Sequence, residues 1–350
     1  MNTITINASR QYDVIIGSGI LSTLGSHLKA LTKADKICIV SDSNVFPLYG
    51  SATANSLTEC GYQVDSFVFP AGEESKNGTT YLELLNFLAQ NQLTRNDCIV
   101  ALGGGVVGDL SGFAAATYLR GITYVQVPTT LLAAVDSSVG GKTAIDLPAG
   151  KNLCGAFYQP SLVLCDVDTL NTLPADIFRD GCAEVVKHGV LFDAALFNYL
   201  TEAGLHFDRQ KVISRCVELK RDVVVQDEFE SGLRMKLNLG HTIGHGVEKH
   251  SNFTISHGSA VSIGMAIVAR AAAKAGLCSA KTVDDILYVL LNLGLPTGTT
   301  FDAQMLFNAA LSDKKRSGGT VNLIIPRAIG QCDIVPTPVS ELKSFIEAGL

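Results

Sequence analysis

The hydrophobic and polar positions of the chain follow one pattern up to about residue 170. Short apolar runs rich in β-branched residues alternate with helical patterns, and the clearest runs cover residues 12–16, 36–40, 63–69, 98–102, 124–127 and 162–165. Helical patterns at residues 22–31 and 80–91 lie between them. This alternation is typical of a mostly parallel sheet with crossover helices. We therefore expect a Rossmann-like α/β domain at residues 1–172.

The pattern changes to long helical periods after about residue 173. These periods cover residues 176–192, 209–225, 240–250, 259–275, 283–292 and 302–312, and only residues 320–325 have the pattern of a strand. Apolar positions that recur every three to four residues indicate amphipathic helices. We therefore expect a second, mainly α-helical domain at residues 173–350.

Composition narrows the class of protein. The chain has 350 residues, is 47% hydrophobic and only 17% charged, so it can bury a large core. A net charge of −6 argues against a nucleic-acid-binding surface. The most apolar helical pattern, residues 260–273, is too short to span a bilayer, and the N-terminus has no signal-peptide pattern. The nine cysteines form no C-x-x-C pair, so we expect a cytoplasmic protein with reduced thiols.

A histidine-rich segment at residues 233–258 is the strongest candidate for a reaction site. His241 and His245 are four residues apart and would share one helix face, and His257 follows after a turn. Imidazole is a common ligand of zinc, so the segment predicts a metal site, and spacing alone favours His241 and His245 as the ligand pair. Thr242 stands where a zinc protease has glutamate, which argues against a protease. The alternative is a set of surface histidines on an amphipathic helix.

A glycine-rich turn is the candidate nucleotide site. The sequence GGGVVGD at residues 103–109 matches G-x-G-x-x-G directly after an apolar strand, so bare amides could approach a pyrophosphate. The alternative is a turn with a packing role. Asp42, at the end of another strand, could bind an adenine ribose and favours NAD over NADP. In a standard Rossmann unit the acid follows the glycine turn by about twenty residues. Asp42 precedes the turn, so the domain is not a standard Rossmann unit.

Further candidates are charged residues beside glycine, asparagine or aspartate. The sequence GGKT at residues 140–143 is not a P-loop, since Asp136 stands where a glycine is needed, but Lys142 could still bind a phosphate as a charge. The basic candidates are Arg120, Lys142, Lys151, Lys187, Lys220, Arg234 and Lys314. Each one alone could be a solvated surface residue. If they lie together around a cleft, they would form a pocket for a phosphorylated, carboxylated small molecule. Glu184 shares a helix face with Lys187 and His188, either as a salt bridge or as a carboxylate ligand that completes the histidine site.

Several long motifs, taken in order, resemble 3-dehydroquinate synthase of the shikimate pathway in its single-function bacterial form. The motifs are ALGGGVVGDLSGFAAATYLRG, VQVPTTLLAAVDSSVGGKTAID and GKN between residues 101 and 152, GCAEVVKHG at residues 181–189, the histidine-rich segment, and DKK at residues 313–315. The resemblance implies a dehydroquinate synthase-like fold, an NAD-binding domain, a helical domain with one divalent metal, zinc or cobalt, and an active site in the cleft between the domains.

The resemblance also implies roles for individual residues. It makes Glu184, His241 and His257 the metal ligands and places His245 near the departing phosphate, which replaces the pair suggested by spacing. NAD contacts are implied for Asp42, Asn44, Glu73, Lys76, Gly104, Gly105, Val106, Asp109, Thr129, Thr130, Lys142 and Lys151. Substrate contacts are implied for Arg120, Asp136, Lys142, Lys151, Asn152, Lys187, Lys220, Arg234, Asn238 and Lys314. His188 receives no role.

The chemistry implied by the resemblance is a cycle at one site. Transient oxidation by NAD acidifies a C–H bond of 3-deoxy-D-arabino-heptulosonate 7-phosphate, phosphate leaves, the hydride returns, and ring opening and an intramolecular aldol step give 3-dehydroquinate. The net reaction is that of a lyase, and the resemblance suggests a homodimer. The alternatives are another sugar phosphate cyclase or a metal-dependent polyol dehydrogenase of the same superfamily. A catalytically silent NAD-binding protein is disfavoured because all the implied metal ligands and Lys142 are present.

Overall fold

The computed structural model describes residues 1–311, 316–317 and 319–350, which form two compact units. Unit 1 comprises residues 1–174 and 209–228, and unit 2 comprises residues 175–208 and 229–350. The hydrophobic pattern predicts a single division after residue 172. The units differ from that division in one element, because helix α7 (Arg209–Gln226) lies in unit 1.

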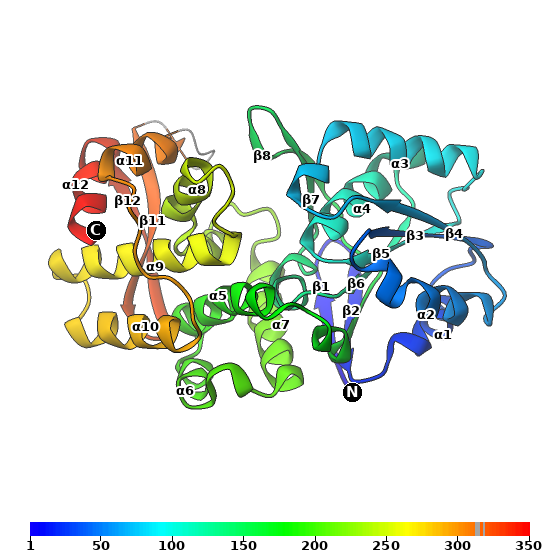
Figure 1. The fold of residues 1–350 in the computed structure, drawn as a ribbon, viewed down its shortest axis with the longest axis horizontal. Coiled ribbons are helices and arrows are strands. Elements are labelled where there is room, and N and C mark those ends of the chain that lie inside the picture. Colours follow the sequence, from blue (N-terminus) through cyan, green and yellow to red (C-terminus); the bar gives the residue numbers. More distant parts are fainter. Residues whose placement is uncertain (312–315, 318) are drawn as a thin grey trace. The chain divides into compact units, whose positions relative to one another are not determined.

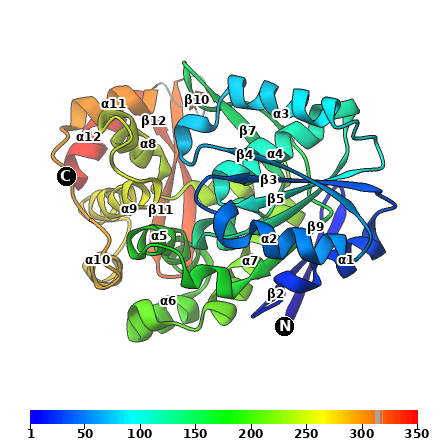
Figure 2. The ribbon, with the colours of Figure 1, turned by 45° about the vertical axis from the view of Figure 1, so that its right-hand side comes forward.

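A seven-stranded sheet forms the centre of unit 1, in the order β1-β2-β9-β6-β5-β3-β4 (Figures 1 and 2). Its strands are β1 (Asn2–Asn7), β2 (Gln11–Gly17), β3 (Lys36–Asp42), β4 (Gln63–Phe69), β5 (Cys98–Gly103), β6 (Thr123–Pro128) and β9 (Leu162–Asp166). Every pairing is parallel except that of β1 with β2. The six strands expected in this unit are confirmed, and the α/β class with them.

Helices cover both faces of this sheet because its central strands are apolar on both sides. Successive residues of a strand point to opposite faces. On β3, Ile37 and Ile39 belong to the core formed with α1 (Leu24–Leu31) and α2 (Phe46–Thr58). Cys38 and Val40 belong to the core formed with α3 (Gly78–Gln90) and α4 (Gly105–Thr117). This two-sided burial explains the continuous apolar runs in the sequence.

Helix α2 and two strand-containing parts of unit 1 have no counterpart in the predicted elements. Strand β1 is one, and the antiparallel hairpin of β7 (Lys142–Leu147) and β8 (Gly150–Phe157) is the other. The sequences of the two strands, KTAIDL and GKNLCGAF, do not alternate regularly between polar and apolar residues, so their pattern is weak. The GGKT segment leads into strand β7 and not into a helix, which agrees with the rejection of a P-loop.

Unit 2 consists mainly of helices around α9 (His257–Lys274), most of which is buried. The other helices are α5 (Ala175–Phe192), α6 (Ala194–Ala203), α8 (His241–His250), α10 (Ala280–Asn292), α11 (Ala303–Leu311) and α12 (Val339–Gly349). A small antiparallel sheet contains β10 (Arg316–Ser317), β11 (Thr320–Ala328) and β12 (Gln331–Pro338). The expectation of a single strand here was wrong. Pro336 and Pro338 weaken the pattern of β12, and an edge strand tolerates them.

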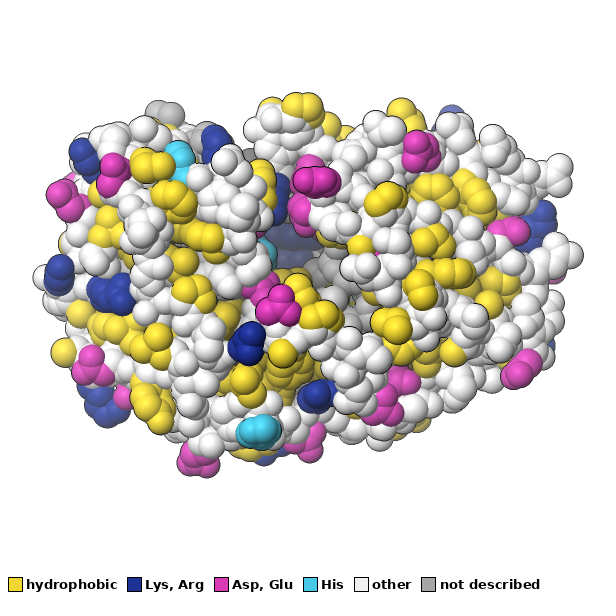
Figure 3. Space-filling model, in the orientation of Figure 1, with side chains coloured by type: hydrophobic (Ala, Val, Ile, Leu, Met, Phe, Trp, Pro, Cys, Tyr) yellow, Lys and Arg dark blue, Asp and Glu magenta, His cyan; other side chains and the backbone are white. Residues whose placement is uncertain are grey.

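The surface charges, the length of the helices and the thiols add three observations. Basic and acidic side chains are interspersed on the face shown in Figure 3. Among the described residues, no helix combines the length and the apolar character needed to cross a bilayer. All nine cysteines are free, and burial raises the pKa of the Cys38 thiol to about 12, so this thiol stays protonated and unreactive.

Candidate metal centre and nucleotide site

Three side chains of unit 2 converge on one point. Glu184 comes from the middle of α5, whereas His241 and His257 are the first residues of α8 and α9. The potential ligand atoms of the three residues all lie within 4.8 Å of one another. Glu184 Oε1 lies 3.5 Å from Nε2 of His241 and 3.3 Å from Nε2 of His257. The spacing-based pair is therefore not the group that converges, since Glu184 and His257 join His241 instead of His245.

The burial of Glu184 tests whether a cation fits this group. Its side chain is 1% exposed, and Oε1 accepts no hydrogen bond from any described residue. Lys187 pairs with the other oxygen, Oε2. A buried carboxylate oxygen without a donor costs free energy unless a cation or donor satisfies it. One carboxylate oxygen and two imidazole nitrogens are a common donor set for a catalytic divalent metal, so the residues fit such an ion.

Each of the two imidazole rings, of His241 and of His257, has a hydrogen-bond acceptor beside its Nδ1 atom. Nδ1 of His241 lies 3.1 Å from the carbonyl oxygen of Leu239, and Nδ1 of His257 lies 3.4 Å from Oε2 of the buried Glu248. An acceptor at Nδ1 favours the proton there and leaves the Nε2 lone pair for a metal. Burial lowers the pKa of His257, but the nearby carboxylates of Glu184 and Glu248 outweigh this effect and raise that pKa to about 10.

The other histidines of the region take different places. The His245 ring lies one turn after His241 on α8, with centroids 5.6 Å from the ring of His241 and 6.4 Å from that of His257. The His245 ring is thus a neighbour of the cluster. His188 is fully buried, and its Nδ1 lies 2.8 Å from the carbonyl oxygen of Glu184 in its own helix. That position supports a structural role for His188.

Arg234 and Asn238, both predicted substrate residues, lie on the short helix η7 (Leu233–Asn238) in unit 2. Arg234 is 1% exposed, and Lys187 on α5 is equally buried. Asn238 Nδ2 donates a hydrogen bond of 2.6 Å to Oε1 of Glu230, a residue that the sequence did not single out. Buried cations are rare unless an anion lies beside them, and for Lys187 that anion is Glu184. Lys314 lies outside the described residues.

In unit 1 the glycine turn joins β5 to α4 and places bare backbone at a helix N-terminus. A Cβ atom on Gly104 would lie 3.0 Å from Cγ2 of Thr130, and one on Gly105 would lie 3.2 Å from Oγ of Ser137. The turn therefore packs closely against the segment after β6, where Thr129 N donates to the Gly103 carbonyl at 3.0 Å. Amides at such a helix start are an anion site, and Val106 lies in this first turn.

Asp42 ends β3, the strand beside β5, so it lies at the same sheet edge as the glycine turn. Its Oδ1 accepts hydrogen bonds from the backbone N–H groups of Asn44 at 2.8 Å and Val45 at 2.9 Å. These two bonds orient the carboxylate at the carboxyl end of the sheet. Ligands of open α/β sheets bind at this end, so the position suits contact with a ribose.

A polar network connects four of the predicted residues around the buried Lys76. Lys76 Nζ donates hydrogen bonds of 2.6 Å to Oδ2 of Asp109 and to Oδ1 of Asn152. Glu73 lies within ion-pair distance of both Lys76 and Lys151, at 3.9 and 3.7 Å. Burial lowers the pKa of Lys76, but Asp109 and Glu73 outweigh it and raise the pKa, so the ammonium stays charged.

Two further contacts belong to unit 1. Asp146 of β7 holds the hairpin turn, since its Oδ1 accepts from Asn152 N at 2.7 Å, and Asn152 has a positive φ of 54°. Lys220 of α7 pairs with Asp136, and its Nζ also donates to the Asp136 carbonyl oxygen at 2.5 Å. Arg120 and Lys142 are exposed, so both can reach a ligand. Asp146 was not predicted from the sequence, because its contact with Asn152 forms only when the hairpin turn folds.

Comparisons with known proteins give the family. Residues 66–180 match the 3-dehydroquinate synthase N-terminal family model, and residues 181–316 match the 3-dehydroquinate synthase C-terminal model. The chain is 48% identical over 354 residues to 3-dehydroquinate synthase of Pelobacter propionicus, covering 99% of each chain. It is 41% identical over 350 residues to the Enterococcus faecalis enzyme, covering 98% of each.

Solved structures with the same fold include other cyclases. The chain superposes with a TM-score of 0.88 on 2-deoxy-scyllo-inosose synthase complexed with carbaglucose-6-phosphate, NAD⁺ and Co²⁺, at 26% identity and full coverage of both chains. It superposes equally well, at 29% identity and 98% coverage of both, on the 2-epi-5-epi-valiolone synthase ValA of Streptomyces hygroscopicus with NAD⁺ and Zn²⁺ bound. An iron-containing alcohol dehydrogenase at 15% identity shares the fold with a TM-score of 0.68. By its sequence and its fold, this chain belongs to the 3-dehydroquinate synthase family.

Proposed function

We propose that this chain converts 3-deoxy-D-arabino-heptulosonate 7-phosphate to 3-dehydroquinate and phosphate, as a lyase that uses NAD and one divalent metal ion. The observation that carries the proposal is the convergence of Glu184, His241 and His257 in a member of this family. The 3-dehydroquinate synthases similar over nearly the whole chain support the substrate. The two cyclase structures, with NAD⁺ and Co²⁺ or Zn²⁺ bound, support the cofactors.

The metal ligands would be Oε1 of Glu184 and Nε2 of His241 and His257. A bound divalent metal supplies Lewis-acid chemistry, which lowers the pKa of a substrate hydroxyl that it coordinates. Three protein ligands leave coordination positions open for the substrate. The acceptors behind the rings, Leu239 O and Glu248 Oε2, keep both imidazoles in the orientation that binding needs. His245, beside the cluster, is the candidate to hold or move a proton near the departing phosphate.

The nucleotide would bind at the glycine turn of unit 1. NAD supplies a hydride acceptor that returns the hydride in the same cycle, so no net oxidation occurs. The amides of residues 104–106 would bind the pyrophosphate, and Asp42 would accept a hydrogen bond from a ribose hydroxyl. The remaining assignments follow the resemblance, and they are Asn44, Glu73, Lys76, Asp109, Thr129, Thr130, Lys142 and Lys151.

Substrate binding is assigned to cations and amides in each unit. A phosphorylated sugar acid carries phosphate and carboxylate groups, which lysine and arginine bind through charge-assisted hydrogen bonds. In unit 1 the assigned residues are Arg120, Asp136, Lys142, Lys151, Asn152 and Lys220. In unit 2 they are Lys187, Arg234 and Asn238, with Lys314 outside the described part. We further propose a cytoplasmic homodimer.

A second candidate function is that of another sugar phosphate cyclase. The fold shared with the inosose and valiolone synthases favours this class. Identity separates the two candidates, because those cyclases are 26% and 29% identical to the chain whereas the 3-dehydroquinate synthases reach 41–48%. The dehydrogenases share only the fold, so they supply no argument about activity.

The test uses metal-stripped protein with the heptulosonate phosphate as substrate. NAD⁺ and zinc or cobalt are added singly and together, and released phosphate and 3-dehydroquinate are measured. Release of both products only when NAD⁺ and metal are present is the expected result. Turnover of a different sugar phosphate, with no reaction of the heptulosonate, would favour the second candidate. Accumulation of NADH with simple polyols would contradict both.

A further inference from the structure

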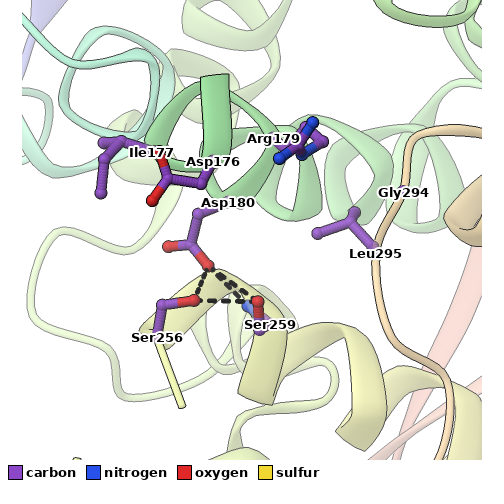
Figure 4. Close-up of a pocket in the computed structure, with 8 residues that line it drawn as sticks. All are labelled: Asp176, Ile177, Arg179, Asp180, Ser256, Ser259, Gly294 and Leu295. Atoms are coloured by element: carbon purple, nitrogen blue, oxygen red, sulfur yellow. Dashed lines mark hydrogen bonds between the residues drawn. The ribbon is translucent and has the colours of Figure 1, made fainter. Parts of the chain in front are cut away.

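The first turn of α9, which begins with His257, is tied to helix α5 by one carboxylate. Asp180 of α5 accepts hydrogen bonds from the backbone N–H groups of Gly258 at 3.0 Å and Ser259 at 2.7 Å. It also accepts from the hydroxyl of Ser259 at 3.2 Å and from that of Ser256 (Figure 4). Ser256 is the N-cap residue of α9, yet its side chain makes no cap. Asp180 therefore caps α9 from another helix.

Backbone packing at Gly258 is a second, independent sign of this attachment. A Cβ atom on Gly258 would lie 1.9 Å from the carbonyl oxygen of Asp180, far closer than two such atoms can approach. Only glycine lets the backbone of this turn contact α5 directly. The two helices thus touch through main chain and are joined by four hydrogen bonds at the same place.

A proposed metal ligand lies close to this attachment on each of the two helices. On α5, Asp180 precedes Glu184 by four residues, so both lie on one helix face. On α9, His257 directly precedes Gly258, and its Nε2 lies 3.3 Å from Oε1 of Glu184. The distance between these two ligands therefore depends on how firmly the turn is held to α5.

We propose that Asp180 is a positioning residue of the metal centre, which holds His257 at the distance from Glu184 that a metal ion requires. The proposal rests on the proposed metal site. The carboxylate also lies at the positive end of the 18-residue helix α9, where a negative charge is stabilised. Asp180 acts through the backbone around His257 and touches neither the metal nor the substrate.

The surroundings of Asp180 make it suitable for substitution. It borders a pocket of about 210 Å³ that is open to solvent, lined by Asp176, Ile177 and Arg179 of α5, by Ser256 and Ser259, and by Gly294 and Leu295 (Figure 4). A shorter side chain at residue 180 would enlarge this pocket without opening a cavity in a packed core. We therefore expect variants of Asp180 to fold.

The test measures metal affinity directly, by competition with a chelator and by the absorption spectrum of bound Co²⁺. Asp180→Ala removes all four hydrogen bonds and is expected to weaken Zn²⁺ and Co²⁺ binding by roughly 10–100-fold and to change the Co²⁺ spectrum. Asp180→Asn keeps Oδ1 as acceptor for Ser259 but turns an amide donor toward Gly258 N. Its loss of affinity should fall between those of wild type and Asp180→Ala.

Two control variants separate positioning from general damage. Asp176→Ala removes a carboxylate from the same helix and the same pocket. Ser279→Ala removes the side-chain cap of α10, which accepts from Thr282 N at 3.1 Å in the same unit. Both should bind metal as wild type does. Unchanged affinity in Asp180→Ala, or an equal loss in Ser279→Ala, would overturn the positioning role. Wild-type protein that binds no metal, or Glu184→Gln that binds it normally, would overturn the metal site itself.

Discussion

At the scale of single residues, the proposed metal centre depends on the side chains that contact its ligands as much as on the ligands themselves. Glu248 is 2% exposed and places Oε2 3.4 Å from Nδ1 of His257. Its sequence neighbourhood is an ordinary helix surface pattern, so no motif indicates this role. The contact joins α8 to the start of α9 and exists only in the folded chain.

Substitution of Glu248 should therefore weaken metal binding. Glu248→Gln keeps the size of the side chain but removes the charge that orients His257, and a loss of about 10-fold in Zn²⁺ affinity is expected. The measurement is competition with a chelator. Lys249→Ala, on the exposed face of the same helix, is the matched control and should bind normally. Equal affinities of Glu248→Gln and wild type would contradict the role of Glu248.

His257 also predicts a pH dependence for the metal-free protein. Its pKa of about 10 lies above the ordinary value of 6.5, so the folded state binds this proton more tightly than the unfolded state does. The resulting stabilisation is fully present below pH 6.5 and is lost as the pH rises through 10. The free energy of unfolding of wild type relative to His257→Ala should therefore fall between these pH values in urea titrations. A difference that is constant with pH would show that the proton is not held.

At the scale of elements, His241 and His257, the two proposed ligand histidines, begin helices α8 and α9, so the contact of each helix start with its neighbours sets the geometry of the proposed site. Gly258→Ala tests this at α9, because the added Cβ would lie 1.9 Å from Asp180 O and must push the turn away from α5. We expect a loss of roughly 1–3 kcal/mol in the free energy of unfolding, as for an overpacked core, and weaker metal binding. Gly298→Ala, where nothing lies within 4 Å, is the control and should be neutral in both measurements. Wild-type behaviour of Gly258→Ala would contradict the close packing.

The elements also show what the sequence could predict. Six strands of the large sheet in unit 1 were predicted because buried strands are continuous apolar runs, and the helices that carry His241 and Glu184 were predicted because amphipathic helices have a strong local period. Strand β12 was missed because Pro336 and Pro338 interrupt its pattern. Asp180 and Glu248 were missed for a different reason. They act on His257 from 77 and 9 residues away through tertiary contacts, which no local pattern records.

At the scale of the whole molecule, each unit carries one part of the proposed chemistry. Unit 1 contains the glycine turn, Asp42 and the Lys76 network. Unit 2 contains the Glu184, His241 and His257 group and the buried Arg234. The net charge of −6 coexists with these basic groups because they are placed singly and not in runs. An anionic substrate is therefore met by local positive charge within an acidic protein.

The most direct test of the proposed reaction is the number of 3-dehydroquinate molecules formed per NAD⁺. Zinc-loaded protein receives the heptulosonate phosphate and an amount of NAD⁺ far below that of the substrate. The proposed cycle predicts many product molecules per NAD⁺, with an equal amount of phosphate and no accumulation of NADH. A yield that stops at one product per NAD⁺, with NADH formed in equal amount, would contradict a cycle in which the hydride returns to the substrate.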